Sequence, residues 1–346
     1  MTELLLPPFQ RWLLYSTLLL VTGVLGWRGF VAGRVRFALG GGDPRPAAEL
    51  PAVARLERRM AAIGLAAALL LLVAWGLRLL VQLLAFRDPF VPVSEDLAFL
   101  VGDPLWGRVW IVQGLAAVGL AAAFAWLRAT AGKRAPPEPG LTPEGIPRTG
   151  PRPVELPGAW RGAAACVALL LLTLGLSSHA MSVPWNRPLA VGVDIAHATA
   201  AGLWIGVLAL VLLGTPRGAG AGADGDEAPP GTLLAAQLRA FSPLAMGSVG
   251  VLLFMGVLLS GYHLPSIPAL WESRYGRTLL VKVALSLGVL ALGFVNWRKG
   301  LPQVDTPAGR GRLRRAASLE VGLALAVLLV TAILVATPLP PGAHDP

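Results

Sequence analysis

Eight apolar runs, each about as long as a bilayer is thick, dominate this chain of 346 residues. A helix needs about 20 apolar residues to cross the hydrocarbon core, and backbone in lipid must satisfy its own hydrogen bonds. We therefore expect an all-α fold, a polytopic membrane protein with eight transmembrane helices. The predicted spans are 11–32, 61–86, 106–127, 161–179, 189–214, 241–263, 278–297 and 317–337. The first run lacks a small-residue cleavage site, so we expect it to remain as a span.

Basic residues gather in alternate loops, and this pattern predicts the orientation. Most of the 29 Lys and Arg residues lie in or beside four loops, at 33–60, 128–161, 215–239 and 298–316. Cytoplasmic loops are enriched in Lys and Arg, so we expect these four loops inside the cell and both termini outside. The net charge of +10 is thus explained by topology and does not indicate a nucleic-acid partner.

An internal repeat divides the chain into two predicted halves. The segment "LWGRVWIVQGLAAVGLAAAFAW" (105–126) aligns without a gap on "RYGRTLLVKVALSLGVLALGFV" (274–295). We expect two parallel four-helix halves, residues 1–180 and 181–346, related by an axis along the membrane normal. In the first half we expect mainly scaffold, or a different polar site around Arg78.

Three of the four histidines fall near the predicted outer face. His179 ends the fourth predicted span, and His263 ends the sixth. His197 lies about 12 Å into the fifth span at 1.5 Å per residue, while His344 is in the C-terminal tail. Ionisable side chains in membrane spans are costly and commonly functional. Three helices that bring imidazole to one leaflet predict a metal site.

Two further side chains extend this predicted metal site. Asp194 is three residues before His197 on the same helix face, where it can orient the imidazole or bind metal itself. Met181 follows His179 in a short loop and offers a thioether. Imidazole suits copper, zinc and iron; thioether favours Cu(I), whereas a carboxylate favours Cu(II). Other polar groups could orient the site or line a pathway: Trp204, Tyr262, Arg277 and Lys282.

Other interpretations of these residues remain open. Each histidine alone can be interfacial, and Asp194 can simply favour a helix N-terminus. Two histidines on facing helices can instead ligate haem b, in a haem or quinone redox protein. A third alternative is an assembly scaffold whose polar groups only stabilise the bundle. We expect no enzymatic activity, because the sequence has no nucleophile–base pair and no phosphate-binding loop.

The motifs of the second half resemble the copper resistance protein D (CopD) family. They are "SSHAM" (177–181), "VDIAHATAAGLWIGVLAL" (193–210), "FSPLAMGSVGVLLFMGVLLSGYHL" (241–264) and "SRYGRTLLVKVALSLGVLALGFVNWRK" (273–299). The resemblance implies a bacterial inner-membrane (plasma-membrane) protein that handles copper at a periplasm-facing site, by transport or by delivery. It also implies two possible partners besides the copper ion and lipids, a periplasmic CopC-like protein or a membrane cuproprotein such as an oxidase.

Overall fold

The computed structural model describes residues 2–39, 51–130, 134–135, 152–153, 157–183, 186–215, 230–264 and 266–340, so His344 lies outside the described part of the chain. Each predicted run overlaps a helical segment that is long and apolar enough to cross a membrane. The prediction of an all-α polytopic protein with eight spans is confirmed. Apart from helices, the described residues contain one antiparallel pair of two-residue strands, β1 (Arg134–Ala135) and β2 (Arg152–Pro153).

Four spans belong to the first half of the chain. They are α1 (Thr2–Gly26) continued by the π-helical turn η1 (Trp27–Val31) and α2 (Ala32–Leu39), then α4 (Pro51–Phe86), α6 (Trp106–Thr130) and α7 (Pro157–Gly175). Four more follow: α8 (Arg187–Ala201) continued by the π-helical turn η3 (Gly202–Gly206) and α9 (Val207–Gly214), then α10 (Pro230–His263), α12 (Arg274–Val295) continued by η4 (Asn296–Gly300) and η5 (Leu301–Gln303), and α13 (Pro307–Ala336). Three short elements connect them: α5 (Val93–Gly102), η2 (His179–Ser182) and α11 (Ala269–Glu272).

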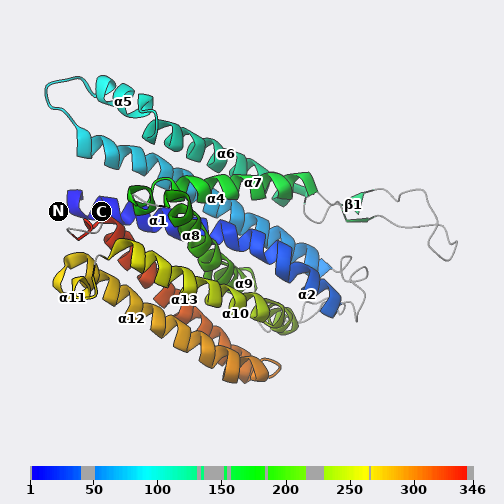
Figure 1. Ribbon diagram of the computed structural model, residues 1–346. Coiled ribbons are helices and arrows are strands. Elements are labelled where there is room, and N and C mark those ends of the chain that lie inside the picture. The colour runs from blue at the N-terminus through cyan, green and yellow to red at the C-terminus, as the bar shows by residue number, and fades with distance from the viewer. Residues whose placement is uncertain are drawn as a thin grey trace.

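The spans form one bundle with two distinct ends (Figure 1). At one end α1 begins and α13 ends, beside α5 and α11; we call this the terminal end. At the other, the basic end, α2 ends and α13 begins. α1 lies in the middle and packs against α4, α7, η3, α9 and α13, while α10 packs on α8 and α12 on α13. α1 contacts helices from both predicted halves, so the contacts do not separate the bundle into two halves. The division therefore stays a prediction.

The helices are longer than predicted, mainly at the basic end. The first span continues to Leu39 instead of 32, and the second begins at Pro51 instead of 61. α10 has 34 residues, or about 51 Å at 1.5 Å per residue, against about 30 Å of hydrocarbon. These extra turns carry the charged residues that limit a prediction from hydropathy. At the terminal end, by contrast, α7 stops at Gly175, so the predicted end at 179 was wrong.

α1 and η3 cross with almost no side chain between them. A Cβ added to Gly23 would lie 2.6 Å from the carbonyl oxygen of Gly206, and one added to Gly202 would lie 2.6 Å from Cβ of Thr22. Small residues allow such close backbone approach between helices in a membrane. The glycines of "GLWIG" therefore hold α8 and α9 against the centre of the bundle, which fixes the depth of the residues on α8.

Candidate metal centre

His179 lies just outside the membrane helix that precedes it. α7 ends at Gly175, and the chain re-enters a turn of 3-10 helix at His179, capped by the Ser178 hydroxyl, which accepts a hydrogen bond from the amide of Ala180 (3.2 Å). The turn directs the His179 ring towards the last turn of α13, where Nε2 lies 3.1 Å from the carbonyl oxygen of Val335. This short turn corrects the prediction that His179 ends a span.

His263 is the last residue of α10 and meets His179. The residue is buried, and its Nδ1 lies 2.8 Å from the carbonyl oxygen of Leu259 one turn earlier. The centroids of the His179 and His263 rings are 6.1 Å apart, and the ring planes are inclined at 68°. Tyr275, near the start of α12, lies on another side of His263 with its ring centroid 6.4 Å away. Two of the predicted ligands are therefore neighbours.

The hydrogen bonds of these two histidines determine which ring nitrogen carries the proton. A carbonyl oxygen only accepts, so Nε2 of His179 and Nδ1 of His263 must both be donors. In the neutral ring the other nitrogen then carries a lone pair. Histidines that bind metal usually donate their second N–H in this way, often to a backbone carbonyl. Both rings thus direct one N–H at a backbone carbonyl, as metal-binding histidines commonly do.

His197 forms a second level, closer to the middle of the bundle. Its ring lies against Gly256 of α10, where an added Cβ would be 3.5 Å from Cε1 and 3.8 Å from Nδ1. It is hydrogen-bonded to the backbone of Leu252, whereas Nδ1 is buried and has no hydrogen-bond partner among the described residues. Gly256 precedes His263 by seven residues, so the two histidines differ in depth by about 10 Å.

Asp194 lies between charged and polar groups from three other segments. Its carboxylate is hydrogen-bonded to the side chain of Ser178 and interacts electrostatically with Lys282 of α12. The phenol groups of Tyr15, on α1, and Tyr275 are also within its electrostatic reach. Lys282 acts on His197 as well. Lys282 therefore acts electrostatically on Asp194, but the two side chains form no ion pair in the structure.

The other predicted residues differ in their relation to the histidines. Met181 and Tyr262 both pack against one small cluster of buried residues, formed by Ala180, Val183, Ala190 and Val191. Arg277 is exposed. Trp204 is buried, and its side chain contacts Glu320 of α13. The structure thus brings Met181 and Tyr262 near the outer level and leaves Arg277 and Trp204 apart from it.

The candidate ligands are arranged in two levels and do not form one compact cluster. In the described parts of the chain, no three His, Cys, Asp or Glu side chains gather closely enough to hold a metal ion. His179 and His263 form the outer level, and His197 with Asp194 forms the inner one. Such an arrangement can receive an ion at one level and pass it to the next.

Sequence reasoning missed three side chains that border these levels. Ser178 and Tyr275 lie within the quoted motifs, but nothing in the spacing indicated that they would approach Asp194 or His263. Tyr15 lies more than 170 residues away in the chain, and only the packing of α1 brings it there. A polar residue inside an apolar run was the signal available for Tyr15, and it applies equally to Glu320.

The predicted polar site around Arg78 takes shape in the first half. Arg78 donates hydrogen bonds to Oε1 of Gln113 (2.5 Å) and to the Ser177 hydroxyl (3.1 Å). Its guanidinium group also lies over the Trp106 ring, 5.8 Å from the centroid. Through Ser177 this cluster adjoins the turn that carries His179. The first half therefore supports the loop of the candidate metal centre.

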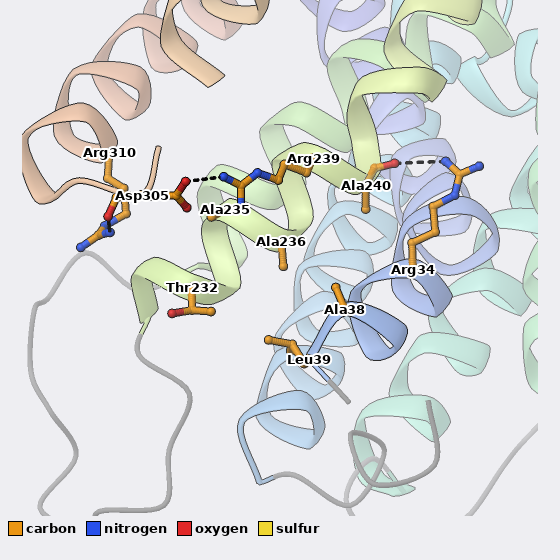
Figure 2. A pocket seen from close by; sticks show the side chains of 10 residues that line it. All are labelled: Arg34, Ala38, Leu39, Thr232, Ala235, Ala236, Arg239, Ala240, Asp305 and Arg310. Atoms are coloured by element: carbon orange, nitrogen blue, oxygen red, sulfur yellow. Dashed lines mark hydrogen bonds and ion pairs between the residues drawn. The ribbon is translucent and has the colours of Figure 1, made fainter. Parts of the chain in front are cut away.

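A pocket of about 430 Å³ lies at the basic end (Figure 2). It is lined by α2, α10, the segment before α13 and the first turn of α13. Arg239 donates to Oδ2 of Asp305 (2.6 Å), and Arg310 donates to the carbonyl oxygen of the same residue (2.8 Å). Arg34, on the opposite wall, donates to the carbonyl oxygen of Ala240 (3.2 Å). Three arginines repel cations, so this pocket does not extend the candidate metal centre.

Comparisons with known proteins agree with the motifs. Residues 235–334 match the family described as copper resistance protein D. A curated relative, the copper transport protein CutJ of Bacillus subtilis (strain 168), is 31% identical over 185 residues, which are 53% of this chain and 32% of the relative. The chain thus spans about a third of that relative's length. No solved structure matches the chain. The predicted resemblance to the CopD family is confirmed.

Proposed function

We propose that this chain carries copper into the membrane from the terminal end, by way of three of its histidines, His179, His197 and His263. The observation that supports the proposal most directly is the pairing of His179 and His263, with ring centroids 6.1 Å apart and one N–H of each ring on a backbone carbonyl. Imidazole nitrogen is a common ligand for copper. The family match and the printed name of the relative, a copper transport protein, favour copper over zinc or iron.

The outer level would receive the ion. An imidazole nitrogen lies about 2 Å from a bound first-row metal ion, so two nitrogens on opposite sides of it are about 4 Å apart. Two imidazole rings with centroids 6.1 Å apart are close enough to share one ion. Met181, two residues after His179, supplies a soft sulfur close by, which suits Cu(I).

The inner level would take the ion next. The buried Nδ1 of His197 has no hydrogen-bond partner in the described chain, and an uncommitted nitrogen of this kind is available to a metal. Asp194 adds negative charge beside it, partly balanced by Lys282. A carboxylate and one imidazole bind Cu(II) better than Cu(I), so the two levels would differ in preference.

The side from which copper arrives follows from the predicted orientation. If the basic loops are cytoplasmic, the terminal end faces the periplasm of a bacterial inner membrane. A periplasmic CopC-like protein would then supply copper to His179 and His263. At the other end of the route, copper would be delivered to a membrane cuproprotein.

Metal analysis of the purified protein tests this function. We expect the wild type to bind copper stoichiometrically, and His197→Ala to lose at least the copper of the inner level. His344→Ala is the matched control, because His344 is outside the proposed route, and it should bind as the wild type does. Equal copper content in all three proteins would exclude the assignment of His197. A Soret band in the purified wild type would instead assign the histidines to haem b.

A further inference from the structure

A single carboxylate lies inside the eighth span, on the basic side of the histidines. Glu320 of α13 is only 3% exposed. It precedes Val335, the partner of His179, by fifteen residues, so it lies about 22 Å further along the helix. Acidic side chains inside membrane spans are rare, face the bundle interior and commonly take part in ion or proton movement. The motifs quoted for the family do not include this residue.

Neutral hydrogen-bond donors surround the Glu320 carboxylate. Asn296, at the start of η4, donates from Nδ2 to Oε2 at 2.8 Å and is itself buried. The side chain of Trp204, in η3, makes a second hydrogen bond. Gly293 leaves the space for this contact, since an added Cβ would lie 3.1 Å from Oε1 and 3.4 Å from Cζ2 of Trp204. Three helices therefore enclose one carboxylate.

No charged side chain is paired with Glu320 among the described residues. α13 packs against α1, α9, α10, α12, η4 and η5. α9 and η5 have no ionisable side chain, and no charged side chain is among the groups that act on Glu320. The described ionisable side chains of the other elements are Arg11 and Tyr15 on α1; Arg239, Tyr262 and His263 on α10; Arg274, Tyr275, Arg277 and Lys282 on α12; and exposed Arg298 and Lys299 on η4. On α13 itself, Arg314 donates to the carbonyl oxygens of Leu212 and Thr215.

The chemistry of this group does not suit copper. Both side chains that hydrogen-bond to Glu320 direct N–H groups at the carboxylate, and no group of three His, Cys, Asp or Glu side chains forms around it in the described structure. A carboxylate without an imidazole or sulfur partner suits harder ions than copper. An isolated carboxylate buried in a membrane exchanges most readily with a proton, because protonation removes the cost of the buried charge.

We propose that Glu320 binds a proton while copper passes the histidines, and releases it when copper leaves. This inference rests on the proposed function. The carboxylate takes the proton from water and returns it to water, so its charge alternates between −1 and 0. Trp204 connects the two sites physically, since it touches Glu320 and lies on the same continuous helix as His197, seven residues further on. Two sites that share one rigid element can influence each other's occupancy.

Copper uptake into liposomes that contain the purified full-length chain tests the proposal. The variants are Glu320→Gln, which keeps the size but cannot ionise, Glu320→Asp, which can, and Glu272→Gln, an exposed acid on α11 as the matched control. We expect a pH difference across the wild-type vesicles to change the uptake rate severalfold. Glu272→Gln and Glu320→Asp should keep this dependence, and Glu320→Gln should lose it while still binding copper. An unchanged dependence on pH in Glu320→Gln would overturn the proposal.

Infrared spectroscopy separates this proposal from the proposed function. If wild-type vesicles take up no copper, the proposed function fails, but the proton site remains testable on the purified protein. Acidification should then produce a protonated-carboxyl band in the wild type that is missing from Glu320→Gln and present in Glu272→Gln. Identical bands in wild type and Glu320→Gln would refute proton binding at Glu320. A purely structural role for Glu320 predicts lower stability for Glu320→Gln with no change in either pH response.

Discussion

The imidazole of His197 rests on Gly256, at a distance that leaves room for one methyl group and no more. An alanine Cβ would lie 3.5 Å from Cε1, which is an ordinary van der Waals contact. We expect Gly256→Ala to bind copper as the wild type does. Gly256→Leu should displace the ring and lower copper affinity about tenfold or more, as changes beside metal ligands commonly do. Copper titration of both purified variants checks this, and equal affinities would show that Gly256 does not position His197.

The pairing of His179 and His263 predicts that their effects on copper binding are not additive. If both rings share one ion, His179→Ala removes most of the affinity of the outer level, and so does His263→Ala. The double variant should then lose much less than the sum of the two single losses in binding free energy. A double-mutant cycle, measured by copper titration, decides the point. Additive losses would place the two histidines in separate sites.

The electrostatic interaction of Asp194 with Lys282 can be tested by the loss and recovery of thermal stability. Asp194→Asn leaves the partly buried ammonium group of Lys282 without the nearby carboxylate that stabilises its charge. We expect thermal unfolding in detergent to occur at a lower temperature. Adding Lys282→Met should recover much of the loss, because the uncompensated charge is removed. If the second substitution instead lowers stability further, the two residues do not stabilise each other.

Two glycines of the second half predict opposite effects of the same substitution. In Gly206→Ala the new Cβ would collide with the backbone of Leu19 and lie 3.2 Å from Cα of Gly23, so we expect a loss of about 1–3 kcal/mol. Gly261 of α10 is exposed, and an added Cβ meets nothing within 4 Å. Gly261→Ala should therefore be neutral or slightly stabilising, since alanine favours helix. Thermal unfolding of the two variants is a direct comparison.

The predicted orientation can be tested with reporter fusions. A reporter that is active only in the cytoplasm should be active when inserted between α6 and α7, and inactive when fused after residue 346. A reporter active only in the periplasm should show the opposite pattern. The reverse result would invert the positive-inside assignment and place the histidines at the cytoplasmic face.

The spans were predictable because a helix in lipid must be apolar over about 20 residues. Their ends and their contacts depend instead on local turns and on packing between helices. The extra turns before residue 61 and after residue 32 are amphipathic helix, which hydropathy alone does not detect. His179 was assigned to a span because an apolar run continues to Leu176, but the backbone leaves the helix at Gly175. A histidine beside an apolar run is recognisably unusual in the sequence. The direction of the His179 ring, however, is set by the turn of 3-10 helix, which the sequence does not reveal.

The same limit applies to the candidate site. The sequence identified the histidines and Asp194 because each interrupts an apolar pattern. It also placed His197 deeper than His263. It could not indicate that the rings of His263 and His179 meet, because this depends on how the end of α10 packs beside the turn that follows α7. Nor could it indicate that Trp204 turns to Glu320, since the two residues are 116 positions apart and belong to helices that meet only in the folded bundle.

The crossing of α1 and η3 also limits how this bundle can move. At Gly23 and Gly206 the two backbones touch, so the helices cannot come closer, and sliding along each other would drive neighbouring side chains into the contact. Rotation about the point of contact meets less resistance, because the atoms that meet between Gly23 and Gly206 are backbone atoms. A rearrangement that exposes His197 first to one side of the membrane and then to the other would therefore be a rotation of α8 and α9 relative to α1 about this glycine pair.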